Sequence, residues 1–201
     1  MRWLLLLGLP LLAPWSFESD EVDKPPAGFD FATTAKAPAG KWVVINDGGN
    51  KVLAQLDKDT TDRRYAMAVA KEQKFTNVRL SVRGKPVSGE VDQAVGLVWR
   101  WQDADNYYVA RSNVLEGNVR LYRVVKGNRI KFAGKEELKI KAGEWHTLRV
   151  EHRGPAIKVF LGDDKVIESE DRTFVDAGRV GVWIKSDSVT HFDDLTAEEM
   201  K

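Results

Sequence analysis

A segment in the middle of the chain brings arginine, asparagine and tyrosine together in a pattern that favours ligand binding. Residues 94–125 read AVGLVWRWQDADNYYVARSNVLEGNVRLYRVV, which predicts three strands joined by two tight hairpins. Arginine presents several N–H donors in a fixed plane, asparagine presents a donor and an acceptor, and a tyrosine ring packs against apolar C–H groups. Gathered on one rigid face, these side chains have the chemistry of a sugar-binding surface.

The register of the two hairpins sorts the side chains onto two sides of the sheet. With loops at 102–105 and 114–117, Arg100 lies opposite Tyr107, and Arg111 lies opposite Arg120. Opposed residues share a side of a sheet, and each strand alternates sides. The apolar side, expected to face the core, carries Leu97, Trp99, Tyr108, Ala110, Val119 and Leu121. The polar side is the predicted ligand-binding face and carries Arg100, Tyr107, Arg111, Asn113, Asn118, Arg120 and Tyr122.

The rest of the chain predicts the frame around this face. From Lys41 onward, short β-branched and aromatic runs alternate with turn signals, and no window shows a sustained helical period. Thirteen strands are expected, the first near 42–45 and the last near 189–197. The predicted fold is all-β: a two-sheet antiparallel β-sandwich or jelly roll, forming a single domain over 41–199. Residues 17–40, rich in Pro, Gly, Ala and acidic residues, are expected to be a linker.

The first sixteen residues, MRWLLLLGLPLLAPWS, have the pattern of a secretory signal peptide. Their apolar stretch of ten residues is too short to cross a bilayer, and acidic sequence follows. We expect cleavage between Ala13 and Phe17, with no integral membrane segment left; the alternative is an uncleaved interfacial anchor. The protein is then periplasmic, at the cell surface or secreted. The absence of cysteine suits a bacterial envelope.

The charge balance excludes some classes of partner. The chain has 31 basic and 30 acidic residues, and removal of the leader takes away one arginine and no acid. Nucleic acid and anionic membranes both demand a concentrated positive field, which a neutral protein of this kind lacks. The polar face instead points to a saccharide or glycan as the partner, and we expect the protein to be a monomer.

Three motifs resemble a known group of proteins: GLVWRWQDADNYYVARSNVLEGNVRLYRV, GEWHTLRVE and GRVGVWIKSDSVTHFDDL. With the TF pair at 173–174, they resemble the exported concanavalin A-like lectin/glucanase (laminin-G-like) jelly-roll domains. More narrowly, residues 42–195 are similar to the bacterial 3-keto-disaccharide hydrolase-like or "family 16 glycoside hydrolase-like" group. The resemblance implies two stacked sheets with a concave, carbohydrate-facing surface that Lys185 flanks. Lectins, binding modules and glycosidases share this fold, so the fold does not fix the function.

Catalytic residues are less clearly marked than the polar face. Family 16 glycosidases carry their carboxylates as E-x-D-x-(x)-E on one strand; residues 90–92 begin that pattern, but its last glutamate is missing. The acids that can reach the rim of the face are Asp103, Asp105, Glu116 and Asp187. Glu116, in the turn beside Asn113 and Asn118, is the candidate catalytic residue. The three histidines (His146, His152 and His191) lack metal-ligand spacing and are expected to be structural.

A structural Ca²⁺ is common in jelly rolls of this resemblance, and Asp193 is its candidate ligand here. Asp193 and Asp194 are adjacent on a predicted strand, so their side chains point to opposite faces and only one can serve a given site. The alternative for Asp193 is an acid at the core edge, bonded to backbone. The remaining tryptophans (Trp42, Trp145 and Trp183) are expected in the core.

Three functions remain open from the sequence. The first is a saccharide-binding module, because the polar face is evident and a carboxylate pair is not. The second is a glycoside hydrolase or lyase acting on a disaccharide, including a 3-keto sugar, through a metal or a lone acid–base residue. The third is a protein-interaction scaffold at the cell surface. As a surface change, Arg111→Ala is expected to abolish saccharide binding and to alter stability by less than about 1 kcal/mol.

Overall fold

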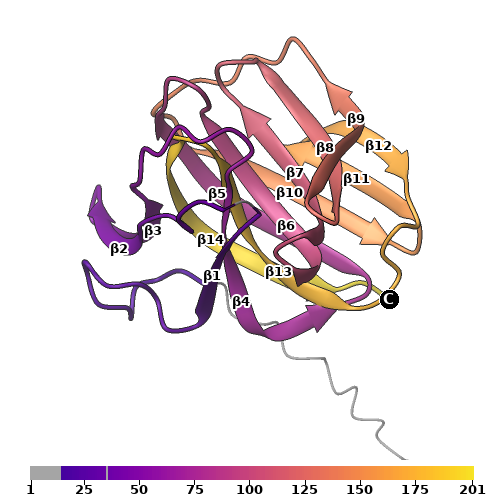
Figure 1. Cartoon of the computed structure of the whole chain (residues 1–201), viewed down its shortest axis with the longest axis horizontal. Helices are drawn as coiled ribbons and strands as arrows, with labels where there is room; N and C mark the ends of the chain where they lie inside the picture. Colours follow the sequence, from indigo (N-terminus) through magenta and orange to yellow (C-terminus); the bar gives the residue numbers. More distant parts are fainter. Residues whose placement is uncertain (1–14, 35) are drawn as a thin grey trace, which may run out of the picture.

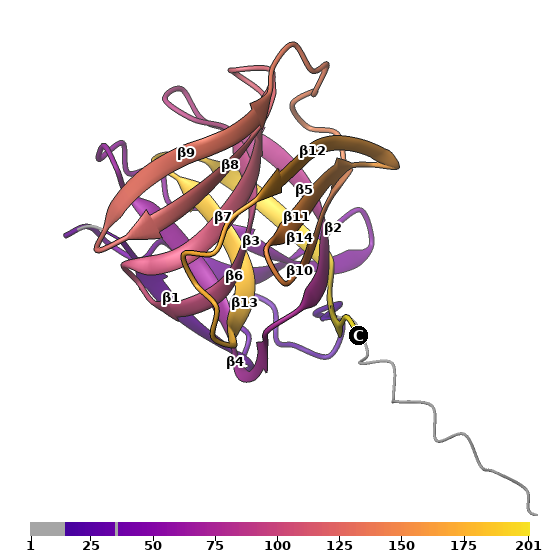
Figure 2. The same ribbon diagram turned by 90° about the vertical axis from the view of Figure 1, so that its right-hand side faces the viewer.

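Short β-branched runs separated by turns fold into strands throughout the chain. The computed structural model describes residues 15–34 and 36–201, so the predicted leader lies outside the described residues except for its last two positions. Fourteen strands form two antiparallel sheets of seven, stacked face to face as a β-sandwich jelly roll (Figure 1). Figure 2 shows β9, β8 and β7 in one layer and β12, β11 and β10 in the other. The predicted fold class is confirmed.

The first sheet contains the predicted binding face. Its strands run in the order β1 (Phe29–Thr33), β4 (Tyr65–Phe75), β13 (Gly178–Lys185), β6 (Ala94–Asp103), β7 (Asn106–Asn113), β8 (Asn118–Val125) and β9 (Asn128–Lys135). The second sheet has the order β12 (Asp164–Glu170), β11 (Ala156–Leu161), β10 (His146–Arg153), β5 (Val78–Ser88), β14 (Val189–Glu199), β3 (Asn50–Gln55) and β2 (Trp42–Asp47). None of the described residues forms a helix long and apolar enough to span a membrane.

Strand β1 lies inside the segment that the sequence predicted to be a linker. It pairs with β4, so that Phe29 lies opposite Ala70, and the ring of Phe29 is buried in the core. Phe17 is also buried, and the backbone N–H of Trp15 donates to the carbonyl of Leu195 at 2.9 Å. The linker prediction was therefore wrong for this stretch, because proline, glycine and acidic residues around a five-residue strand hide its pattern.

The core between the sheets contains the predicted apolar set. Leu97, Trp99, Tyr108, Ala110, Val119 and Leu121 are all fully buried there. Trp99 stacks on Tyr108 with ring centroids 5.5 Å apart, and its Nε1 donates to Nδ1 of His152 at 2.8 Å. Burial of a large side chain contributes about 1.5–3 kcal/mol, so this layer holds the two sheets together.

Of the three other tryptophans that the sequence predicted to lie in the core, two are buried and one is not. Trp42 and Trp183 are buried, as expected. Trp145, just before β10, is only half-buried, and the cations of Arg83 and Lys85 lie 5.1 and 5.3 Å from the centroid of its ring. The core position predicted for Trp145 is wrong, because the residue stands on the solvent side of the second sheet.

Candidate functional site

The outer face of the first sheet, turned away from the second sheet, gathers polar residues from several strands. Lys185 of β13 lies opposite Tyr65 of β4, and Arg111 of β7 lies opposite Arg120 of β8. Opposed residues share a face, so these four side chains stand on one side. We call the hydrogen-bonded group at this end of the sheet the polar cluster; it consists of Asp92, Arg111, Asn113, Glu116, Asn118, Arg120, Glu136 and Lys185.

Arg111 is the centre of the polar cluster. Its side chain is only 2% exposed, and Nη2 donates to Oε2 of Glu116 at 2.8 Å and to the Tyr122 hydroxyl at 3.3 Å. Nη1 donates to Oδ1 of Asn118. A buried guanidinium with these partners is held in one orientation, and it holds its carboxylate partner in turn.

Glu116 supplies the carboxylate that is bonded to Arg111, and it is partly exposed. Its Oε2 also accepts from Asn118 at 3.1 Å and lies 2.7 Å from Nη1 of Arg120. Oε1 has no hydrogen-bond partner within 15–34 and 36–201, and 36% of the side chain is exposed. Burial alone raises the pKa of Glu116, but the charge of Arg111 and the bonds from Asn118 and Arg111 outweigh it, so the pKa lies below its usual range. Glu116 is therefore an ionised, fixed acceptor.

Asp92 lies on the other side of Asn113 from Glu116. Nδ2 of Asn113 donates to Oδ1 of Asp92 at 2.7 Å, and Oδ1 of Asn113 accepts the backbone N–H of Glu116 at 3.1 Å. Nζ of Lys185 donates to Oδ2 of Asp92 at 3.0 Å. Burial raises the pKa of Asp92, against the charge and the hydrogen bond of Lys185, and none of its side chain is exposed.

Asp187 holds the turn that carries Asp92. Its carboxylate accepts the backbone N–H groups of Glu90, Val91 and Asp92 at 2.6 to 3.1 Å. The turn also requires Gly89, since a Cβ there would lie 1.9 Å from the carbonyl oxygen of Asp92. Asp187 was expected at the rim of the face, but it is buried and positions the turn that carries Asp92.

Next to the polar cluster, the outer face carries a second buried apolar cluster, which includes four aromatic side chains. Tyr65 stacks on Trp183 with centroids 5.4 Å apart, and Trp183 lies over Gly96, where a Cβ would meet its ring at 2.8 Å. Arg129 of β9 reaches across, with Cζ 4.6 Å from the ring centroid of Tyr65 and 4.5 Å from that of Tyr122. Tyr122 is only 5% exposed, so its ring is not the open stacking surface that the sequence suggested.

A hollow of about 260 Å³ opens beside this aromatic group. It is lined by Asp62, Arg63, Tyr65, Gly127, Asn128 and Arg129. Nη1 of Arg129 is buried and has no partner among the residues that the structure describes. Aromatic side chains thus cover part of the outer face. A ligand can reach the face at the polar cluster and at this hollow.

Arg100 does not lie on the outer face, and its predicted pairing with Tyr107 is wrong. The pairing of β6 with β7 keeps Trp99 opposite Tyr108 but then shifts, and the next pair is Asp103 with Asn106. At this bulge Arg100 has a φ of 44°, and its guanidinium donates to the carbonyls of Thr76, Gly154 and Phe174. A β-bulge redirects a side chain in this way, and the alternation pattern gave no sign of it.

Three other predicted face residues are present on the face but buried. Tyr107 is fully buried, with its hydroxyl 2.6 Å from Oγ1 of Thr34 and 3.4 Å from Nε1 of Trp183. Asn113 and Asn118 are each 1% exposed, and they hold Asp92 and Glu116 in place. The side chains of the polar cluster that remain available to a ligand are therefore Glu116, Arg120, Glu136 and Lys185.

The other sequence candidates have local partners. Oδ1 of Asp103 accepts the backbone N–H of Asp105 at 2.8 Å within their hairpin. His146 lies 2.7 Å from the Ser112 hydroxyl, and His191 lies 2.8 Å from Asp47, which are structural contacts.

Asp193, the candidate calcium ligand, is 4% exposed and accepts the N–H of Asp194 at 2.8 Å. Across the described chain, no group of three or more His, Cys, Asp or Glu side chains is placed to hold a metal ion. Among the described residues, nothing around Asp193 supports its predicted role as a ligand.

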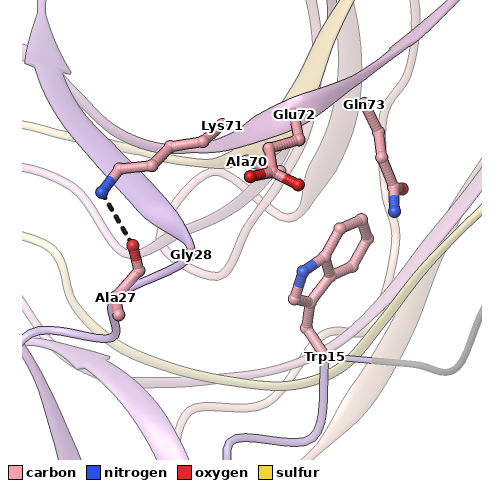
Figure 3. A pocket seen from close by; sticks show the side chains of 7 residues that line it. All are labelled: Trp15, Ala27, Gly28, Ala70, Lys71, Glu72 and Gln73. Atoms are coloured by element: carbon pink, nitrogen blue, oxygen red, sulfur yellow. Dashed lines mark hydrogen bonds between the residues drawn. The ribbon is translucent and has the colours of Figure 1, made fainter.

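A second hollow, shown in Figure 3, lies where β4 bulges away from β13. It has a volume of about 220 Å³ and is lined by Trp15, Ala27, Gly28, Ala70, Lys71, Glu72 and Gln73. Its wall includes Trp15, which belongs to the predicted leader. The hollow therefore has this wall only in a chain that retains Trp15.

Solved structures that resemble the chain are β-sandwich proteins. The carbohydrate-binding module CBM66 from Bacillus subtilis matches with a TM-score of 0.66 at 20% identity, covering 84% of this chain and 95% of that one. A Bacillus subtilis protein of unknown function with a galectin-like fold has a TM-score of 0.61 at 8% identity, covering 85% and 89%. A GH43 protein from Bacillus licheniformis has a TM-score of 0.62 at 15% identity, covering 89% of this chain and 38% of its own.

No protein-family model matches the chain, and no curated protein matches it. At identities of 20% and below, the likeness to solved structures concerns the fold. The chain therefore has the β-sandwich jelly-roll fold that these lectin-like and glycosidase-like structures share.

Proposed function

We propose that the chain binds a saccharide on the outer face of its first sheet, through the polar cluster. Glu116 carries this proposal, because Oε2 is fixed by Arg111, Arg120 and Asn118 while Oε1 has no partner within the described residues. A sugar hydroxyl donates to such an acceptor, and a neighbouring hydroxyl accepts from an ammonium or guanidinium group. Likeness in fold to a carbohydrate-binding module supports this function.

The ligand contacts in this proposal are mainly polar. Lys185 uses one N–H on Asp92, which leaves two for a ligand, and Arg120 is 27% exposed. Arg129 covers the rings of Tyr65 and Tyr122, so these aromatic groups form the floor of the site. Fixed charged groups that bind the hydroxyls of a sugar determine its orientation and the selectivity of the site. Buried apolar area contributes less to both.

The protonation and the exposure of the Glu116 and Asp92 carboxylates favour binding over hydrolysis. A glycosidase needs a protonated acid that can reach the glycosidic oxygen. Glu116 is exposed but is held ionised by two arginines, whereas Asp92 has a raised pKa but no exposed surface. In this arrangement neither group is an accessible proton donor.

One observation keeps the hydrolase or lyase alternative as a second candidate. The pKa values of Asp92 and Glu116 are moved in opposite directions, and Asn113 joins the two residues. Environments that separate two carboxylates in this way are common where an acid and a base act together. The substrate proposed for that case is a disaccharide, including a 3-keto sugar, as the sequence resemblance implies.

Native mass spectrometry over time, with a panel of neutral, acidic and 3-keto oligosaccharides, tests both candidates. The wild type is compared with Glu116→Gln and with a matched control, Glu168→Gln, an exposed glutamate of β12 that pairs with Lys165. We expect persistent complexes for the wild type and the control, and affinity roughly tenfold lower for Glu116→Gln through loss of a charge-assisted hydrogen bond.

Other results of this experiment would change the proposal. Equal affinity in Glu116→Gln would remove the polar cluster from the proposal. Shortened or eliminated sugar in the wild-type sample would establish the enzyme. Absence of any complex across the panel would leave the protein-interaction scaffold as the remaining function.

We also propose that the protein is exported and monomeric. The leader-like sequence of residues 1–16 supports export. Cell fractionation tests the location, and gel filtration coupled to light scattering tests the monomer.

A further inference from the structure

A small pocket at the far end of β6 contains a buried arginine that has no acidic partner among the described residues. The pocket has a volume of about 130 Å³ and is lined by Thr76, Arg100, Gly154, Pro155, Arg172 and Val175. Arg100 follows Asp92 of the polar cluster by eight positions, most of them in β6, which is roughly 25 Å at about 3.3 Å per residue of strand. The pocket is therefore separate from the proposed saccharide site.

The partners of Arg100 are all carbonyl oxygens. Nε and Nη2 donate to the carbonyl of Thr76 at 2.9 and 2.7 Å, Nη2 also donates to that of Gly154 at 3.2 Å, and Nη1 donates to that of Phe174. A guanidinium has five N–H donors, so one N–H on Nη1 is left over. These bonds clamp three turns together, but carbonyl groups carry no net charge to balance the cation.

The carboxylates near this pocket are bonded to groups other than Arg100 and Arg172. Within the described residues, no carboxylate lies within 4 Å of the guanidinium of Arg100 or Arg172. The acid of the adjoining loop, Asp171, accepts from Arg123, from the Tyr108 hydroxyl and from the N–H of Thr173. Arg100 itself is 2% exposed, and burial lowers its pKa. A buried charge without a counter-ion is unfavourable.

The backbone is strained to aim Arg100 at this place. Its φ of 44° lies in the left-handed region, which is unfavourable for a residue with a side chain. The bulge also requires Gly178 on the neighbouring strand, since a Cβ there would lie 2.3 Å from the carbonyl carbon of Arg100. Strain of this kind persists where the surrounding structure enforces it, and it clusters at ligand sites.

We infer that this pocket binds an oxyanion between Arg100 and Arg172: a sulfate, phosphate or carboxylate group. Arginine N–H donors match the geometry of such groups, and an anion supplies the negative charge that Arg100 lacks. The volume admits one small group rather than a sugar ring. The anion is either a free ion or a charged substituent on an acidic glycan, and both present the same chemistry to the pocket.

Sodium sulfate is the first probe. Its effect on the melting temperature is measured against sodium chloride at equal ionic strength, for the wild type, Arg172→Ala and Arg63→Ala. Arg172 is exposed, so its removal spares the fold, whereas Arg100→Ala would release three turns. Arg63 is an exposed arginine elsewhere, with 78% of its side chain accessible, and serves as the matched control.

We expect a saturable, sulfate-specific rise in melting temperature for the wild type and the control. For Arg172→Ala the apparent dissociation constant should be roughly tenfold weaker, as for loss of one charge-assisted contact. Equal effects of sulfate and chloride on the wild type, or an unchanged response in Arg172→Ala, would overturn the inference.

Two further arms identify the source of the anion and separate this site from the polar cluster. Tighter binding of glucose 6-sulfate than of inorganic sulfate, lost in Arg172→Ala, supports a glycan substituent, whereas equal or weaker binding supports a free ion. Glu116→Gln should keep the full sulfate response, because the oxyanion pocket does not depend on the proposed saccharide site. A response abolished by Glu116→Gln alone would contradict a separate site.

Discussion

Nη2 of Arg111 lies 2.8 Å from Oε2 of Glu116, and this contact joins a buried cation to a carboxylate that is 36% exposed. The buried partner fixes the geometry, while the exposed partner can meet a ligand. Arg120 approaches the same oxygen from the neighbouring strand at 2.7 Å, with 27% of its side chain exposed. The two arginines are opposed in register but differ in burial, and mutation should separate their roles.

Arg111→Ala should lower the free energy of unfolding by about 2–3 kcal/mol. The substitution leaves Asn118 and the Tyr122 hydroxyl without their partner in a buried place. This replaces the sequence-based expectation of less than about 1 kcal/mol, which assumed a surface side chain. Urea denaturation measures the difference, and a change below about 0.5 kcal/mol would contradict the buried placement.

Arg120→Ala should change stability by less than about 1 kcal/mol, because exposed ion pairs contribute little. Its contacts are Glu116 and Glu136, both partly exposed. Saccharide affinity should nevertheless fall severalfold, since Arg120 is one of the donors open to a ligand. Calorimetric titration of the sugar identified by mass spectrometry measures this, and full affinity in the variant would exclude Arg120 from the site.

Trp99→Ala should destabilise the protein by about 3–5 kcal/mol, as for removal of a large buried ring. Trp99 is fully buried, stacks on Tyr108 and donates to His152. Trp145→Ala is the matched control; as Trp145 is half-buried on the other side of the second sheet, its loss should cost much less. Similar melting temperatures for the two variants would contradict the two environments.

Stability should fall as the pH drops below about 6.5. Burial, with the charge of Arg100, lowers the pKa of His152 to about 3, and burial lowers that of His146 to about 4. Between these values and the ordinary 6.5 the unfolded chain binds more protons than the folded one, so acid favours unfolding, by at most about 1.4 kcal/mol per pH unit for each histidine.

The pH 7 to 5 interval isolates this effect, because most carboxylates titrate below it. His152→Gln keeps an acceptor for Nε1 of Trp99 and removes the titrating ring. We expect a shallower loss of unfolding free energy over this interval in His152→Gln than in the wild type. Identical slopes would show that His152 does not remain neutral in the fold.

The exported chain should retain Trp15 and Phe17. Trp15 pairs with Leu195 and its ring lies 6.0 Å from that of Phe29, while Phe17 is 4% exposed. Intact mass measurement of protein from the cell envelope locates the cleavage. We expect it before Trp15, and a chain that starts after Phe17 should melt at a lower temperature. A native start after Phe17 would show that this packing is dispensable.

Sequence pattern was sufficient for the pairing of β7 with β8. Alternation placed Leu121 and Ala110 on one side and Arg111 and Arg120 on the other, and the length of the turn fixed the register. A slip of one residue would have exposed every core side chain, which is why the pattern specifies one answer. The same reasoning explains why pattern analysis missed β1. That strand lies among proline, glycine and acidic residues, where alternation is weak.

Only the tertiary structure decided which residues make the sites. The bulge at Arg100 depends on Gly178, far along the chain, and sends the guanidinium away from the outer face. The contact of Lys185 with Asp92 spans 93 residues. The guanidinium of Arg129 lies over the ring of Tyr65, and this contact joins the two halves of the first sheet. The sequence by itself determined the two-sheet fold and the register of the β7–β8 hairpin, because these follow from period-two alternation and turn chemistry. Burial of Arg111, exposure of Glu116 and the redirection of Arg100 came from long-range packing, which no local pattern encodes.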